Sequence, residues 1–396
     1  MMETLRCVTC GRSYAGGVRY RCDACGDELE VVYEYARAAE EFAGTWTSPG
    51  SIWDRFRSVL PAVRDDAIVT LGEGSTPLVR SRRLAARLGL ERLYLKLEYE
   101  SPTGSFKDRQ VSIAISKAVG EGRTEFATVS SGNVGVALSA YCARAGCDAE
   151  VWVSVDTAES KRLQISMYGA QVKLLPPSDD DIGRYFAVYT GMQRYALAHG
   201  KVPMVSARAV NPYMVEGAKT IAFEIAAALG GAPDHVFCCV GGGGLLGGVY
   251  KGFDELRAMG LIRRIPRVSG GQVIDRMHAP IPRLDEEPYR SGNFYRPLDG
   301  AWAWRSIQAS GGKWVGVTTD DVHAAQQELA LDEGIFAEPQ GAYAVAALSK
   351  ACAGGEIAGN DTVVCTLTGS GLKDMESAAR FRENPRYRAP VNAVFG

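Results

Sequence analysis

The chain has 396 residues, a length that predicts roughly two or three domains and a large buried core. Its 44 lysines and arginines nearly balance 46 aspartates and glutamates, which argues against a nucleic acid or an anionic membrane as the main partner. The uncharged stretch of residues 236–250 is too short and too rich in glycine to span a bilayer. Because the first residues also lack the apolar core of a signal peptide, we expect a globular, cytoplasmic protein.

Four of the ten cysteines form two CxxC pairs within the first 25 residues, and a glycine follows each pair. In a reducing compartment such spacing favours a metal over a disulfide. Four thiolates with no histidine nearby suit a closed tetrahedral zinc site. We therefore predict a zinc ribbon over residues 1–34; a redox pair or coincidental spacing is the alternative. The predicted ligands are Cys7, Cys10, Cys22 and Cys25.

A connector over residues 35–69 carries one predicted helix, which Ser51 can cap and Pro61 ends. The apolar side chains that share one face of this helix are Ile52, Trp53, Phe56 and Leu60.

From residue 70 onward, apolar segments alternate with helical patterns, which is typical of parallel sheets covered on both faces. In such sheets ligands bind beyond the carboxyl ends of the strands, so the loops there carry the candidate chemistry. The expected strands are residues 92–98, 126–131, 149–155, 171–175, 201–207, 235–240, 313–317 and 362–367. The expected helices include residues 134–146, 159–170, 216–230 and 245–260.

Two of these loops carry reactive or anion-binding groups. The loop SPTGSFKDRQ places Lys107 at the start of a helix, where the helix dipole disfavours an ammonium and favours a neutral amine nucleophile. A solvated helix lysine is the alternative reading. The loop SSGNVG joins a strand to a helix, so its free amides can bind an anion and Asn133 adds a donor. A glycine turn capped by serine is the alternative there.

Four consecutive glycines between a strand and a helix are the strongest single signal. Ordering them costs entropy, and close approach of successive amides to a phosphate is a sufficient reason for that cost. The spacing matches neither the GxGxxG fingerprint nor a P-loop, and a close-packed turn is the alternative. Strand 362–367 is followed by further hydroxyls at Thr368 and Ser370. The glycines are Gly241, Gly242, Gly243 and Gly244.

An amine nucleophile, a phosphate cradle, an asparagine loop and a terminal hydroxyl together describe a pyridoxal phosphate site. The chain resembles the threonine synthase group of fold type II pyridoxal phosphate enzymes, in particular the branch with an N-terminal zinc ribbon. The resemblance covers nearly the whole chain and is carried by LRCVTCG, LGEGSTPLV, LYLKLEYESPTGSFKDR, SSGNVGVALSAYCARAG, VGGGGLLGGVYKGFDEL and LTGSGLKD.

The resemblance implies a tryptophan-synthase-β-like α/β fold with two doubly wound domains besides the ribbon. We expect a large cofactor-binding domain over residues 70–109 and 201–396 and a small domain over residues 110–200. It also implies that the protein is a homodimer. The expected small-molecule ligand is an amino-acid substrate.

The resemblance further implies residue roles. Lys107 binds the cofactor covalently and moves the Cα proton, Asn133 bonds the cofactor O3′, and Thr368 faces the pyridine nitrogen. A hydroxyl there makes the ring a weaker electron sink, which suits elimination and replacement more than transamination. The residues expected to wrap the cofactor phosphate are Gly241 to Gly244 and Leu245. Those expected to hold the substrate carboxylate are Ser130, Ser131 and Gly132.

The lead reaction is conversion of O-phosphohomoserine to threonine and phosphate, with Ser105, Arg109 and Asn211 as candidate phosphate contacts. Departures from the family pattern concern the substrate: Val134, Gly135 and Val136 replace residues that usually carry hydroxyls. EPQGA at 338–342 replaces EPTSA, and residues 278–306 are unusually aromatic. A β-replacement synthase or a serine/threonine ammonia-lyase, acting on phosphoserine or an activated serine, is the alternative. A regulatory protein that has lost catalysis is another.

Overall fold

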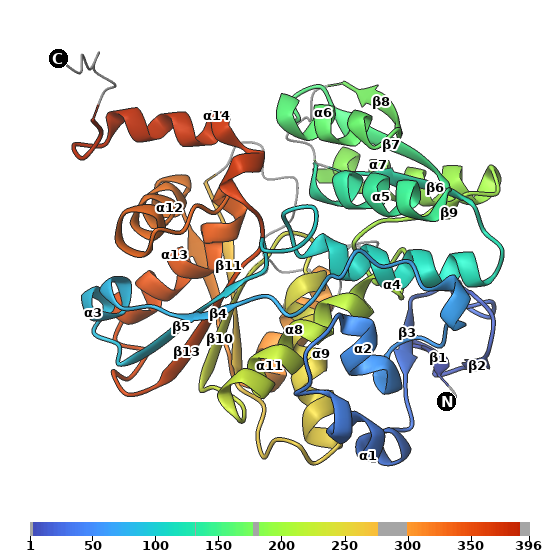
Figure 1. Ribbon diagram of the computed structural model, residues 1–396, viewed down its shortest axis with the longest axis horizontal. Coiled ribbons are helices and arrows are strands. Elements are labelled where there is room, and N and C mark those ends of the chain that lie inside the picture. Colours follow the sequence, from blue (N-terminus) through green and yellow to red (C-terminus); the bar gives the residue numbers. More distant parts are fainter. Residues whose placement is uncertain (1–2, 131, 177–181, 276–298, 389–396) are drawn as a thin grey trace.

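The computed structural model describes residues 3–130, 132–176, 182–275 and 299–388 (Figure 1). Three sheets organise this part of the chain, with orders β2-β1-β3, β12-β11-β10-β13-β5-β4 and β8-β7-β6-β9. A strand forms in each of the eight expected apolar segments, although in segment 201–207 it is only Val202–Pro203. Within the described ranges, no helix combines the length and the apolar character that crossing a membrane requires.

The N-terminal sheet is antiparallel and small. It comprises β1 (Thr4–Cys7), β2 (Ser13–Ala15) and β3 (Leu29–Val32), followed by α1 (Tyr35–Thr45). The predicted connector helix is α2 (Ile52–Phe56), extended by a 3-10 turn (Arg57–Val59). Ser51 caps it in a capping box with Asp54, as its sequence indicates. In Figure 1 this N-terminal region lies beside α8 and α9.

The largest sheet is parallel except at β4, which pairs antiparallel with β5. Helices cover both faces, with α12 and α13 on one side and α8, α9 and α11 on the other (Figure 1). The strands are β4 (Leu78–Arg80), β5 (Arg92–Leu97), β10 (His235–Cys239), β11 (Arg267–Val273), β12 (Trp314–Val317) and β13 (Thr362–Leu367). The helices are α3 (Arg83–Leu88), α8 (Met214–Leu229), α9 (Gly244–Ala258), α11 (Gly300–Ser310), α12 (Thr319–Glu333), α13 (Pro339–Ala353) and the short α14 (Met375–Ala378).

The four-stranded sheet is entirely parallel. Its strands are β6 (Glu125–Val129), β7 (Asp148–Ser154), β8 (Gln171–Leu175) and β9 (Val202–Pro203). Its helices are α5 (Asn133–Ala145), α6 (Glu159–Met167) and α7 (Ile182–Ala198). Helix α4 (Lys107–Gly120) packs against both α5 and α8 and therefore joins the two larger sheets. The domain limits expected at residues 109/110 and 200/201 stay a prediction.

A buried ion network fixes the first turn of α4. The Arg109 guanidinium is fully shielded from water; its Nε lies 2.7 Å from Glu98 Oε2, and its Nη2 lies 2.7 Å from Glu224 Oε2. Glu224 also accepts from Lys96 Nζ at 2.6 Å, and Thr76 and Thr220 complete the shell around Arg109. The expected role of Arg109 as a phosphate contact is therefore corrected. Its donors are already bonded inside the protein, where it anchors α4 to β5 and α8.

Removing one partner of this network leaves a buried charge uncompensated. We expect Arg109→Met to lower the free energy of unfolding by about 3–5 kcal/mol. The matched control Arg257→Met breaks an exposed pair with Asp254, and we expect it to cost less than about 1 kcal/mol. Urea unfolding followed by tryptophan fluorescence measures both; equal effects of the two substitutions would contradict the structural role of Arg109.

Candidate active site

The amine of Lys107 lies at the start of α4 among neutral partners. Its Nζ donates to Ser206 Oγ at 2.7 Å and to Gln110 Oε1 at 3.4 Å, and it lies 4.0 Å from the centroid of the Phe106 ring. Removal from water lowers the pKa of Lys107 to about 8, although the neighbouring acidic groups of Cys239, Glu338 and Asp299 oppose that shift. At that pKa roughly a tenth of the amine is uncharged at pH 7, and the uncharged form is the one that a nucleophile requires.

Asn133 begins α5, and its side chain contacts Glu338 at the N-terminus of α13. Its Nδ2 donates to Glu338 Oε1 at 2.6 Å, and Glu338 Oε2 lies 3.2 Å from Lys161 Nζ. The Oδ1 of Asn133 is buried with no hydrogen-bond partner among the described residues. Because Nδ2 carries two hydrogens, one remains for a ligand. Glu338 was not assigned a role from the sequence.

The tetraglycine segment joins β10 to α9 and presents its backbone. Gly243 has φ +96°, and a Cβ there would lie 2.6 Å from Asp299 O, while a Cβ on Gly244 would lie 2.7 Å from Asp299 Oδ2. The amides of residues 241–245 donate no hydrogen bond to another described residue. Close packing therefore accounts for two of the glycines, and the free amides at the N-terminus of α9 form an anion cradle.

Asp299 closes this cradle from the α11 side. Its carboxylate accepts from the amides of Arg208 at 2.7 Å and Ala209 at 3.1 Å. Burial raises the pKa of Asp299 to about 7, with the neighbouring Arg208 opposing the shift. A share of the carboxyl is therefore neutral near pH 7, which reduces repulsion of an anion.

Thr368 and Cys239 lie at the carboxyl ends of the neighbouring strands β13 and β10. The Cys239 Sγ lies 3.9 Å from Thr368 Oγ1, and burial raises the pKa of Cys239 to about 11. The Thr368 carbonyl accepts from the Phe106 amide at 3.1 Å, which ties this strand end to the Lys107 loop.

The remaining candidates divide. Ser130 is buried and its Oγ accepts from the Gly132 amide at 3.1 Å, whereas Ser131 lies outside the described residues. Ser105 is fully buried, and its Oγ has no partner among the described residues. Asn211 is corrected: its Nδ2 donates to Pro203 O and its Oδ1 accepts from a backbone amide, so it stabilises its own loop. Of the aromatic segment 278–306, residues 278–298 lie outside the described residues.

The four N-terminal cysteines converge, with their sulfur atoms all within 4.8 Å of one another. Cys7 and Cys25 are separated by 3.5 Å between sulfurs, and Cys10 and Cys22 by 3.6 Å. The set consists of thiols alone, a donor chemistry that suits zinc.

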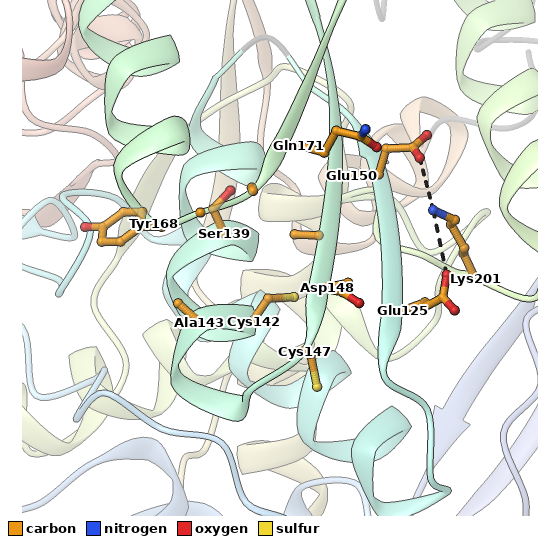
Figure 2. Close-up of a pocket in the computed structure, with 13 residues that line it drawn as sticks. Glu125, Ser139, Cys142, Ala143, Cys147, Asp148, Glu150, Tyr168, Gln171 and Lys201 are labelled. Atoms are coloured by element: carbon orange, nitrogen blue, oxygen red, sulfur yellow. Dashed lines mark hydrogen bonds and ion pairs between the residues drawn. The ribbon is translucent and has the colours of Figure 1, made fainter.

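A hollow of about 330 Å³ lies elsewhere, at the amino ends of β6, β7 and β8 (Figure 2). Lys201 pairs there with Glu150 at 3.0 Å and with Glu125 at 3.8 Å. Ser130 and Asn133 lie at the opposite, carboxyl end of β6, so this hollow is not part of the lysine site.

With this geometry established, comparison with known proteins identifies the family. The model of the family "Pyridoxal-phosphate dependent enzyme" matches residues 69–369. The chain belongs to this family. It is 34% identical to a threonine synthase of Methanosarcina acetivorans over 417 residues, covering 100% of this chain and 99% of the relative. A threonine synthase of Methanocaldococcus jannaschii is 35% identical, covering 96% and 95%. The expected resemblance to threonine synthases is confirmed.

Solved structures confirm the fold type II architecture. The chain is similar to the processed form of threonine deaminase isoform 2 from Solanum lycopersicum, with a TM-score of 0.64 and 19% identity, covering 94% of this chain and 98% of that one. It is also similar to O-ureido-L-serine synthase, with a TM-score of 0.63 and 22% identity, covering 83% and 96%. At these identities the similarity shows the fold alone.

The residues present fit the family's cofactor. The amides of Gly241 to Leu245 and the N-terminus of α9 suit its phosphate, and the uncharged share of Lys107 suits its aldehyde. Ser206 is a neighbour of Lys107 that the sequence analysis missed. It lies inside the expected strand 201–207, but the observed β9 ends at Pro203, so Ser206 belongs to the loop beyond the carboxyl end of that strand.

The lowered pKa of Lys107 sets a pH dependence. Below about 8 the amine is an ammonium and cannot attack; above about 8 it is free. The rate at which cofactor-free protein takes up pyridoxal phosphate should therefore rise with pH and level off above 8. It should be about tenfold below its plateau one pH unit beneath that pKa. Stopped-flow absorbance measures this rate; a midpoint near the ordinary 10.5 would contradict the structure.

Proposed function

We propose that this pyridoxal-phosphate-dependent lyase converts O-phosphohomoserine and water to threonine and phosphate. The observation that carries the proposal is the amine of Lys107, whose pKa is lowered to about 8, beside an anion cradle in a chain aligned over its full length with a threonine synthase. The phosphate of the cofactor occupies the cradle of residues 241–245 in this proposal.

The chemistry that bound pyridoxal phosphate supplies is withdrawal of electrons from the Cα of an amino acid. Lys107 accepts the Cα proton at its Nζ and returns a proton after the leaving group departs. Ser206 orients this amine through its hydroxyl. The neutral hydroxyl of Thr368 faces the ring nitrogen without the charge that a carboxylate would add.

The substrate carboxylate binds the loop of Ser130 and Gly132 in this proposal. Lys161 supplies a cation beside the same loop, since a Cβ on Gly132 would lie 2.4 Å from Lys161 Cδ. We propose that Lys161 and the unpaired hydroxyl of Ser105 bind the leaving phosphate. They take the role that the sequence analysis gave to Arg109 and Asn211.

The missing hydroxyls at the start of α5 are weaker evidence against a phosphate-bearing substrate than the sequence suggests. Val136 is fully buried, and a Cβ on Gly135 would lie 2.6 Å from Val151 Cγ1. These two positions pack against the small sheet, so their lack of hydroxyls leaves the phosphate question to other residues. This observation removes one argument against O-phosphohomoserine as the substrate.

Incubation with O-phosphohomoserine tests the reaction. We expect phosphate and threonine in equal amounts, and we expect Lys107→Ala to reduce the rate by more than about 100-fold because it removes the general base. Lys350→Ala, at a partly exposed lysine paired with Asp321, is the matched control and should retain activity.

Three outcomes would redirect the proposal. Keto acid released from serine or threonine indicates an ammonia-lyase, and product formed only with an added nucleophile indicates a β-replacement synthase. Cofactor binding without turnover of any of these substrates indicates a regulatory protein.

Finer properties extend this proposal. We propose that the all-thiol set of Cys7, Cys10, Cys22 and Cys25 holds a structural zinc ion, supported by the convergence of the four sulfurs. A homodimer in the cytoplasm, with neither nucleic acid nor membrane as partner, remains the expectation from the family and from the balanced charge.

A further inference from the structure

A buried ion pair connects the cysteine ribbon to the loop beside the catalytic lysine. Glu28 Oε2 lies 2.9 Å from Arg208 Nη2, and the two side chains are 6% and 5% exposed. The pair is therefore shielded from water and salt, and it carries both charge and a directed hydrogen bond. The Arg208 guanidinium also stacks on Trp302, with its Cζ 4.3 Å from the ring centroid.

The ribbon end of this pair is fixed by the cysteine loops. The Glu28 carbonyl accepts from the Val8 amide at 3.1 Å, and Val8 lies between the first two cysteines. The Asp27 carbonyl accepts from the Cys22 amide at 2.9 Å. The backbone around Glu28 is thus held by both CxxC segments, and a metal that binds them fixes its position.

The other end of the pair reaches the active site in two directions. Ser206, two residues before Arg208, accepts from Lys107 Nζ at 2.7 Å. The amides of Arg208 and Ala209 donate to Asp299, whose own amide donates to Gly242 O at 2.9 Å. One short loop therefore contacts the amine that binds the cofactor and, through Asp299, the glycine segment.

We propose that Glu28 and Arg208 are positioning residues through which the metal-holding ribbon orients Lys107 and the phosphate cradle. The ribbon is then part of the framework of the active site and not an independent appendage. This inference rests on the proposed cofactor site. It assigns the ribbon a function in cofactor binding, exerted through the 206–209 loop.

A matched pair of carboxylate-to-amide substitutions tests this role. Glu28→Gln removes the charge that pairs with Arg208, whereas Glu3→Gln removes an equally buried ribbon carboxylate that pairs with Lys117, at the far end of α4 from Lys107. We expect Glu28→Gln to raise the Kd for pyridoxal phosphate about 10- to 100-fold, the range seen when supporting contacts of a ligand shell are lost. Glu3→Gln should leave that Kd within about twofold of the wild type.

The readouts separate positioning from simple destabilisation. Cofactor titration gives the Kd, the pH midpoint of the bound cofactor's absorbance reports on the surroundings of Lys107, and thermal unfolding reports on stability. A shift of Kd and absorbance midpoint in Glu28→Gln, at a melting temperature equal to that of Glu3→Gln, supports the proposal. Wild-type Kd and absorbance in Glu28→Gln overturn it.

Metal removal from the wild-type protein is a second, independent test, and it can be carried out even if Glu28→Gln fails to fold. We expect the purified wild type to contain zinc, and its removal with a chelator to raise the Kd as the substitution does. In Glu28→Gln and in Arg208→Met, the same treatment should add little, because the connection is already broken. An unchanged Kd after metal removal from the wild type contradicts the proposal.

Failure of the proposed function gives a different result. If the wild type binds no pyridoxal phosphate at Lys107, the cofactor site itself is wrong. If the wild type binds it normally and the Glu28 and Arg208 variants match the wild type, only the role of the ribbon is wrong.

Discussion

The active site depends on removing one amine from water without giving it a carboxylate partner. Two buried lysines of the described structure do have such partners: Lys96 lies 2.6 Å from Glu224, and Lys219 lies 2.6 Å from Glu216. Lys107 instead contacts a serine hydroxyl and a glutamine carbonyl. Desolvation lowers its pKa to about 8, which leaves a share of the amine uncharged and able to act as a nucleophile.

The ion-paired side chains hold the framework around this amine. The network of Glu98, Arg109 and Glu224 fixes the first turn of α4, which carries Lys107. These ion-paired side chains therefore position the Lys107 amine, which has no carboxylate partner of its own. Breaking such a network is costly because it strands a buried charge. The Glu28–Arg208 pair extends the same arrangement to the N-terminal ribbon.

Much of the fold could be predicted because its strands are continuous apolar runs, which parallel sheets require. Strand β11 was not among the expected strands, because two adjacent glycines and several polar residues interrupt the apolar pattern of its sequence, RVSGGQV. Its glycine pair is instead a packing requirement, since a Cβ on Gly271 would lie 2.5 Å from Tyr343 O on α13. Local pattern cannot reveal a helix that approaches a strand from elsewhere in the chain.

The site shows the same limit. Lys107, Asn133 and the glycines follow strand ends and could be found by that rule. Ser206 could not, because the expected strand 201–207 contained it, whereas the observed β9 ends at Pro203. Arg109 was misassigned because its partner Glu224 lies more than a hundred residues away, and spacing says nothing about which distant carboxylate saturates a guanidinium.

The central claim is that Lys107, and no other lysine, binds the cofactor. Borohydride reduction of the protein with bound pyridoxal phosphate, followed by peptide mass spectrometry, tests this directly. The account predicts a single pyridoxyl-modified peptide that contains Lys107. Modification of Lys96, Lys161 or Lys219 instead, or no modification of a protein saturated with the cofactor, would contradict it.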